Sequence, residues 1–168
     1  MKTNFLFIFF FSFLSVQAQL TVNNDPPNDN PVYLVNNILL GDGVEASNYN
    51  YQGDSIQIGF FNGTASNLGL NSGIVMSTGD ISILDPNFAG FGDFINVNPP
   101  VTDPDLLDVA NSVPALIGQN FVVQDINDVA VLEFDFIPSS DTVTFKYVFA
   151  SQEYFALENS QAFALLVR

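Results

Sequence analysis

The feature that most constrains this sequence is an alternation of apolar and polar residues, with a period of two, that recurs from residue 44 onward. Residues that supply turns, such as Gly53-Asp54 and Gly79-Asp80, separate the alternating segments. The segments predict strands at 44–51, 55–61, 73–78, 121–124, 129–137, 142–150 and 162–167. We therefore expect an all-β fold, a mainly antiparallel β-sandwich of jelly-roll-like form, with one or two short helices.

The helices are predicted from their start signals. Asn30 followed by Pro31 is typical of a helix start, and apolar residues continue from there at helical spacing, which predicts a helix at 31–40. Asp103 followed by Pro104 gives the same signal for a second helix through Ala110. Asn62-Gly63 lies between apolar runs and favours a turn over the alternative, a glycosylation site at Asn62-Gly63-Thr64.

Segment 129–150 predicts a hairpin with its loop at 138–141. In that register Glu133 faces Lys146, and the alternate apolar residues of both arms share one face. The side chains expected to be buried on that face are Leu132, Phe134, Phe145 and Tyr147.

The two ends of the chain define its expected organisation. Lys2, an apolar run at 5–14, and the small residues Val16 and Ala18 predict a signal peptide at 1–18, cleaved after Ala18. The apolar run is too short to span a bilayer. Residues 19–30 are polar and aperiodic, which predicts a linker, and 31–168 are expected to form one β domain. Since the apolar run 162–167 reads as an interior strand and ends at Arg168, we expect the domain to be C-terminally incomplete and to associate through an open strand edge.

Charge and composition exclude several functions. The chain has 18 acidic and 3 basic residues, a net charge of −15, which repels nucleic acids and anionic membranes. It has no histidine and no cysteine, which excludes Ser-His-Asp and Cys-His nucleophiles and zinc sites built on these ligands. A pair of carboxylates acting on a sugar stays open as an alternative.

Calcium is the metal that best matches an acidic chain, because it prefers carboxylate and carbonyl oxygens. Aspartates also cap helices and turns, and that structural alternative explains the same residues. The candidate ligands that lie close together in the sequence are Asp103, Asp105 and Asp108 in one group and Asp125, Asn127 and Asp128 in another.

Several segments together resemble the choice-of-anchor L domain of bacterial secreted and surface proteins. They are "LVNNILLGDGV" (34–44), "IGFFNG" (58–63), "GIVMSTGD" (73–80), "DPDLLDVA" (103–110), "NDVAVLEFDFIPSSDTVTFKYVFASQEY" (127–154) and "AFALLV" (162–167). The resemblance implies an extracellular β-rich module without assigned enzymatic activity. The chain departs from the family pattern at Gln152, where the family has glutamate, and at Ser160-Gln161, where it has Asn-Asp.

Glu153 is the acid of this motif that the chain keeps. It is expected either to bind a cation or to tie down loop backbone N–H groups. The metal hypothesis is one calcium ion held by Glu153 and Asp128, with Asp103 and Asp105 as further ligands.

The resulting interpretation is a secreted, non-catalytic module for surface display, adhesion or ligand binding. Its partner is an extracellular glycan or protein, with the export machinery acting on the signal peptide, and it has no nucleic acid partner and no transmembrane segment. A carbohydrate-active domain with paired carboxylates and a purely structural spacer are the alternatives.

Overall fold

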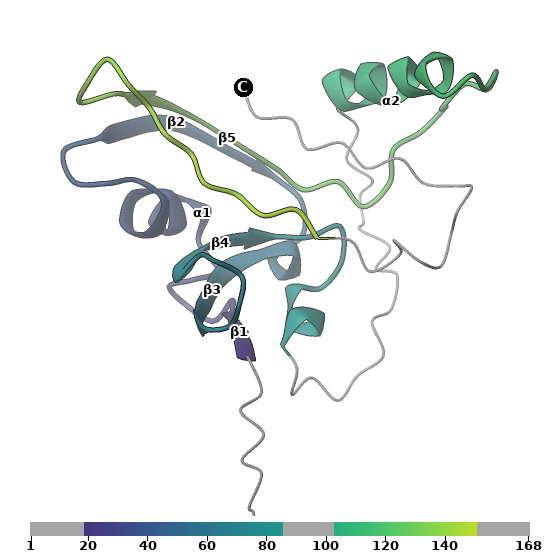
Figure 1. Ribbon diagram of the computed structural model, residues 1–168. Coiled ribbons are helices and arrows are strands. Elements are labelled where there is room, and N and C mark those ends of the chain that lie inside the picture. Colours follow the sequence, from purple (N-terminus) through teal and green to yellow (C-terminus); the bar gives the residue numbers. More distant parts are fainter. Residues whose placement is uncertain (1–18, 86–102, 151–168) are drawn as a thin grey trace, which may run out of the picture.

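The computed structural model describes residues 19–85 and 103–150, and Figure 1 shows their arrangement. Five strands form two antiparallel sheets, one with the order β1-β3-β4 and the other made of β2 and β5. A short helix, α1, lies beside the sheets, whereas α2 stands apart from them (Figure 1). The mainly antiparallel strands in two sheets, with two short helices, confirm the predicted all-β, sandwich-like class.

The three-stranded sheet is built around β3 (Ile58–Ala65). One edge of β3 pairs with β4 (Ser72–Met76), and the other pairs with β1 (Gln19–Asn23). The predicted linker at 19–30 is therefore wrong for its first residues. Strand β1 has only two apolar residues, Leu20 and Val22, within its five residues. Two alternating positions are too few to predict a strand from the sequence.

The two-stranded sheet corrects the predicted hairpin. Strand β5 (Val131–Ile137) pairs with β2 (Glu45–Gln52), which places Glu133 opposite Asn50. Residues 142–150 are extended but join no sheet, so Phe145 and Tyr147 are 45% and 67% exposed. The expectation that these two side chains are buried is wrong.

Strand β2 offers β5 specific partners along its whole length, which the hairpin prediction did not include. The ring of Tyr49 stacks on Phe134 with centroids 6.5 Å apart. On the other side of the strands, side-chain amides of β2 bond the β5 carboxylates: Asn50 Nδ2 donates to Glu133 at 2.9 Å, and Asn48 Nδ2 donates to Asp135 at 2.6 Å. Cross-strand pairs of this kind stabilise a sheet and account for the pairing of β5 with β2. The other edge of β5, to which the predicted hairpin arm would add, joins no strand in the described structure.

The first predicted helix is confirmed, with its start at Asn30. The Asn30 side chain accepts hydrogen bonds from the N–H groups of Val32 and Tyr33 and caps α1 (Pro31–Leu34). The helix continues as a π-helical turn, η1 (Val35–Leu39).

The second predicted helix is also confirmed, although it is longer than expected. Helix α2 spans Pro104–Leu116. The strand predicted at 121–124 does not form, because the side chain of Asn111 binds the backbone of Val123 instead. Asn111 Nδ2 donates to the Val123 carbonyl at 3.1 Å, and Asn111 Oδ1 accepts from the Val123 N–H at 2.8 Å. A side-chain amide thus takes the pairing that a neighbouring strand would have provided.

Two strand boundaries also differ from the prediction. Residues Ser55–Gln57 form a 3-10 turn, η2, before β3 begins at Ile58. Asn62 and Gly63 lie within β3 rather than at a turn, and the chain reverses after Ala65. A Cβ atom on Gly63 would overlap the Leu70 carbonyl oxygen, so glycine at this position permits a close backbone approach rather than a turn.

The core lies where α1 packs against β3, η1 against β4, and the 3-10 turn η3 (Ile81–Leu84) against β1. A Cβ atom on Gly59 would overlap the Ile81 side chain, so the missing side chain lets η3 pack directly on β3. Each large aliphatic or aromatic side chain buried in this way stabilises the fold by about 1.5–3 kcal/mol. The buried apolar residues are Leu34, Val35, Ile58, Phe61, Ile81 and Val129.

The predicted signal peptide at 1–18 and the predicted strand at 162–167 lie outside the described residues. Across residues 19–85 and 103–150, the structure contains no helix with the length and apolar character needed to cross a membrane.

Candidate functional site

Two of the predicted calcium ligands lie at the start of α2. The Asp103 side chain accepts a hydrogen bond from the Leu106 N–H at 2.9 Å, which makes it the N-cap of the helix. Asp105 lies in the first turn, where a negative charge is favourable next to the helix N-terminus. The alternative interpretation of Asp103 as a capping residue is therefore confirmed.

A third predicted ligand, Asp128, lies just before β5 in a left-handed conformation with φ of 57°. Its backbone carbonyl accepts a hydrogen bond of 3.0 Å from Gln57 Nε2. Gln57 is fully buried, and its Oε1 atom accepts from the Asp54 N–H at 2.7 Å. The Gln57 amide thus connects the start of β3 to the loop that leads into the other sheet.

The structure does not bring these acids together into a metal site. Within 19–85 and 103–150, no three His, Cys, Asp or Glu side chains are grouped closely enough to hold a metal ion. Glu153 lies outside the described residues, so the calcium hypothesis stays a prediction. Its direct test is the melting temperature in chelator and in millimolar calcium, since a ligand that binds only the folded chain raises it.

Tyr51 is the ionisable group whose environment differs most from water. Burial raises the pKa of the Tyr51 hydroxyl well above its ordinary value, and the neighbouring charge of Asp54 raises this pKa further. The hydroxyl donates a hydrogen bond of 2.8 Å to the Asp54 carbonyl. A phenol held in its protonated form in this way serves as a structural hydrogen-bond donor and not as a general base.

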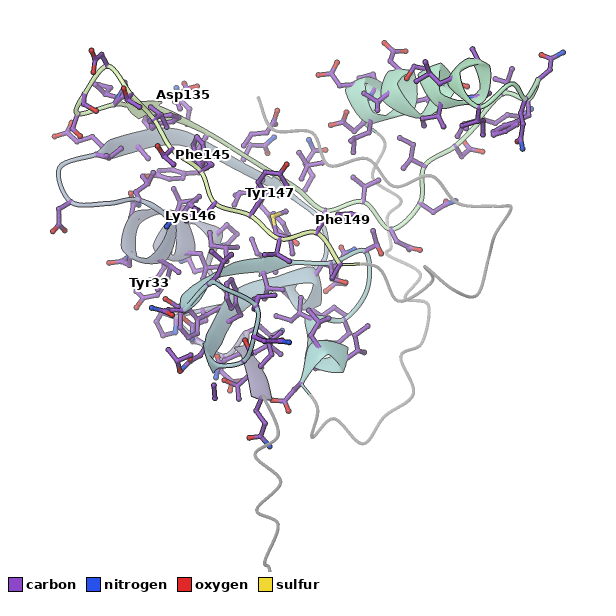
Figure 2. All side chains as sticks on the ribbon, viewed as in Figure 1. Tyr33, Asp135, Phe145, Lys146, Tyr147 and Phe149 are labelled. Carbon is purple, nitrogen blue, oxygen red and sulfur yellow. The ribbon has the colours of Figure 1, made fainter. Side chains whose placement is uncertain are left out.

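The most distinctive surface is segment 142–150, which turns back after β5 and contacts it through the ring of Phe145 (Figure 1). We call the side chains of Val143, Phe145 and Tyr147 the apolar edge; they project from alternate positions of this segment and are 46%, 45% and 67% exposed. Figure 2 shows Phe145, Tyr147 and Phe149 following one another along the segment. Apolar groups of this size, exposed together, are typical of an interaction surface.

Ring contacts hold the apolar edge next to the sheet. The Phe145 ring lies edge-on to Phe136, with centroids 6.2 Å apart, and Phe136 lies 6.1 Å from Phe134. Phe134 in turn stacks on Tyr49 of β2. The Phe145 and Phe136 rings are therefore in contact, as expected if they lie on the same face of the predicted hairpin. No backbone ladder joins the two segments.

The surroundings of the apolar edge are acidic. Glu133 and Asp135 on β5 are exposed, and each accepts a hydrogen bond from an asparagine amide rather than from a cation. Lys146 is the only lysine or arginine among the described residues, and it forms no ion pair within them. The predicted Lys146–Glu133 contact is therefore absent. The carboxylates of β5 keep their negative charge at the surface.

Sequence reasoning missed the apolar edge because it assigned those residues to a buried hairpin. The signal that pointed elsewhere is in β2, where Tyr49 and Tyr51 alternate with asparagine and match the aromatic side of β5. Pairing with β2 occupies one edge of β5, and the other edge forms no backbone ladder with 142–150.

Comparison with known proteins gives one match. The family model of the choice-of-anchor L domain matches residues 21–168, which is most of the chain. No curated protein matches the chain, and no solved structure does.

Proposed function

The chain belongs to the choice-of-anchor L domain family, and on this basis we propose that it is an exported, non-catalytic module that binds an extracellular ligand at or beyond the cell surface. The ligand class is a glycan or a protein. The net charge of −15 supports an extracellular setting in which nucleic acids and anionic membranes are not the partners.

The observation that carries this proposal is the apolar edge. Val143, Phe145 and Tyr147 are exposed together on an extended segment, although alternation of this kind is ordinarily a sign of burial. Exposed aromatic rings supply large contact areas to a ligand at a small cost in side-chain entropy. Aromatic residues are for this reason enriched at binding surfaces.

The test is a binding screen of the exported chain against arrays of extracellular glycans and proteins, with and without calcium. We expect binding that is lost when Tyr147 is replaced by lysine, since this change puts a charge on the most exposed side chain of the apolar edge. A spacer would bind nothing on either array. A carbohydrate-active enzyme would release shortened sugars from its glycan hits, because two carboxylates that flank a glycosidic bond cleave it.

The export step has a separate test. We expect the mature chain to begin at Gln19, because Val16 and Ala18 occupy the small-residue positions before the cleavage site. N-terminal sequencing of the protein recovered from the medium or cell surface checks this, and a mature chain that still begins at Met1 would contradict it.

A further inference from the structure

The backbone of the segment that carries the apolar edge is open to a partner strand. Thr142 exchanges hydrogen bonds with the Ser140 hydroxyl, at 3.4 Å from its N–H and 2.9 Å to its carbonyl. From residue 143 to residue 148, no backbone group forms a hydrogen bond with any part of the chain that the structure describes. A run of extended residues with unpaired N–H and C=O groups is a template to which another strand can add.

The side chains of this template alternate in character. Val143, Phe145 and Tyr147 alternate with Thr144 and Lys146 along the segment, and all five are exposed. The contact between Phe145 and Phe136 anchors the segment to β5, so part of the cost of ordering it has been met before a ligand arrives. A strand that pairs with the segment would therefore cover apolar groups with every second side chain.

The backbone decides between the two ligand classes of the proposed function. A glycan would use the exposed rings alone and would leave the N–H and C=O groups of 143–148 to water. An extended polypeptide satisfies these groups and covers the rings at the same time, as peptides do when they add to a sheet edge. The observations therefore favour a polypeptide.

Charge decides what kind of polypeptide binds. A second copy of this chain would bring another net charge of −15, and Glu133 and Asp135 lie on the strand beside the segment without cationic partners. Complementary potentials accelerate association and select partners, so a basic polypeptide is favoured over a second copy. Lys146 is the local exception, and the residue that faces it should carry no positive charge.

We propose that residues 142–148 bind an extended segment of a basic extracellular polypeptide by β-strand addition. Apolar side chains at every second position of the partner cover Val143, Phe145 and Tyr147, and basic side chains between them are attracted to Glu133 and Asp135. This inference rests on the proposed function, of which it names the partner class.

The test uses the exported chain and fluorescent peptides of about eight residues, the length of an ordinary strand. One peptide alternates valine with lysine, and its matched control has the same composition with the valines grouped together. Two further peptides carry N-methyl groups along one edge or along the other edge, and a last one has glutamate in place of lysine. Fluorescence anisotropy reports binding to each of them.

We expect the alternating lysine peptide to bind, and its affinity to fall as salt is added. N-methylation of the edge that faces the segment should weaken binding about tenfold or more, because several backbone hydrogen bonds are lost together, whereas methylation of the other edge should not. The glutamate peptide and the grouped peptide should bind at least about tenfold more weakly, from charge repulsion and from the lost alternation respectively. Equal binding of all five peptides would overturn the proposal.

Two matched variants locate the site. Tyr147 and Val122 are both exposed apolar residues, at 67% and 74%, and Val122 lies outside the apolar edge, in the segment that follows α2. Tyr147→Lys should abolish binding of the alternating peptide and Val122→Lys should leave it unchanged, with circular dichroism confirming that both variants fold. Loss in both, or in neither, contradicts the location.

The remaining outcomes separate this inference from the function on which it rests. If the chain alone forms dimers that Tyr147→Lys dissolves, the occupant is a second copy and the basic partner is excluded. If the arrays give a glycan that depends on Tyr147 while no peptide binds, the strand-addition inference is wrong and the proposed function stands. If neither arrays nor peptides give a ligand, both fail.

Discussion

The strands of the two sheets have similar alternating sequence patterns, but their apolar side chains are buried to different degrees. In the three-stranded sheet, α1 and η3 pack against β3, η1 packs against β4, and Ile58 and Phe61 are buried. In the β2-β5 region, the same alternation continues into Phe145 and Tyr147, which stay exposed. The difference is the presence of a covering element, which the first sheet has and the end of the second lacks among the described residues.

The comparison teaches that alternation identifies an element that has an apolar side, without showing what covers that side. In β3 the cover comes from α1, which is separated from the strand by η1, β2 and η2, and from η3, which follows after β4. For segment 142–150 no such neighbour is at hand in the described structure.

The largest expected effect is that of Ile58→Ala, because Ile58 is fully buried in the first region. Removing its side chain should lower the free energy of unfolding by about 2–5 kcal/mol. Ile137→Ala is the matched control in β5, where the same residue type is 69% exposed, and it should change stability by less than about 0.5 kcal/mol. Urea unfolding of both variants measures the difference, and equal losses would show that the two regions are packed alike.

The next effect concerns the link between the regions, which passes through Gln57. Gln57→Leu keeps the size of the side chain and removes the bonds to the Asp54 N–H and the Asp128 carbonyl. Each group left without this partner costs about 1–3 kcal/mol, so we expect a loss of about 2–4 kcal/mol. The control is Gln119→Leu, at an exposed position.

Two-state unfolding monitored by both fluorescence and circular dichroism measures this loss. Coincident transitions in Gln57→Leu would show that the regions still unfold together, whereas separate transitions would show that Gln57 couples them. A variant as stable as the parent would contradict the role of the buried amide.

A smaller effect is expected at Tyr51, a half-buried residue near the end of β2. Tyr51→Phe removes the hydrogen bond to the Asp54 carbonyl and should cost about 1 kcal/mol at pH 7. The pKa of Tyr51 is raised in the folded state, so the unfolded chain releases this proton first. The stabilisation from the protonated phenol is therefore complete below about pH 10, the ordinary pKa of tyrosine, and declines as the pH rises above it.

The parent should accordingly lose stability more steeply than Tyr51→Phe between pH 9 and pH 11, and the difference between them should shrink. Urea unfolding at several pH values checks this. Parallel curves for the two proteins would show that Tyr51 ionises alike in the folded and unfolded states, contrary to its burial.

The elements that could be predicted from the sequence are those with local signals. Asn30 and Asp103 marked both helix starts correctly, and the core of β2, β4 and β5 followed from alternation. The pairing of β5 with β2 could not be read in this way, since its partner Asn50 lies 83 residues from Glu133 and competes with a hairpin arm that is next in the sequence. Local propensity describes strands, but it does not choose between possible neighbours.

In the candidate site, too, the features set by local sequence could be predicted and those set by distant elements could not. Asp103 could be assigned as a helix cap from its position before Pro104, because capping is a local property. The exposure of Val143, Phe145 and Tyr147 could not be predicted, because it depends on whether another element covers them. The proposed binding surface is found where the local signal for burial and the observed exposure disagree.

The smallest effect is expected for Phe145→Ala, at the centre of the apolar edge. The hairpin prediction would make Phe145 a buried residue whose loss costs about 3–5 kcal/mol, and this is still the expectation for the buried Phe61. Phe145 is 45% exposed and its packing partner is Phe136, so its replacement should cost at most about 1 kcal/mol. Urea unfolding of Phe61→Ala and Phe145→Ala compares the same substitution in the two regions. A loss at Phe145 as large as that at Phe61 would mean that the apolar edge is covered in solution, and the search for its ligand should then begin within the chain itself.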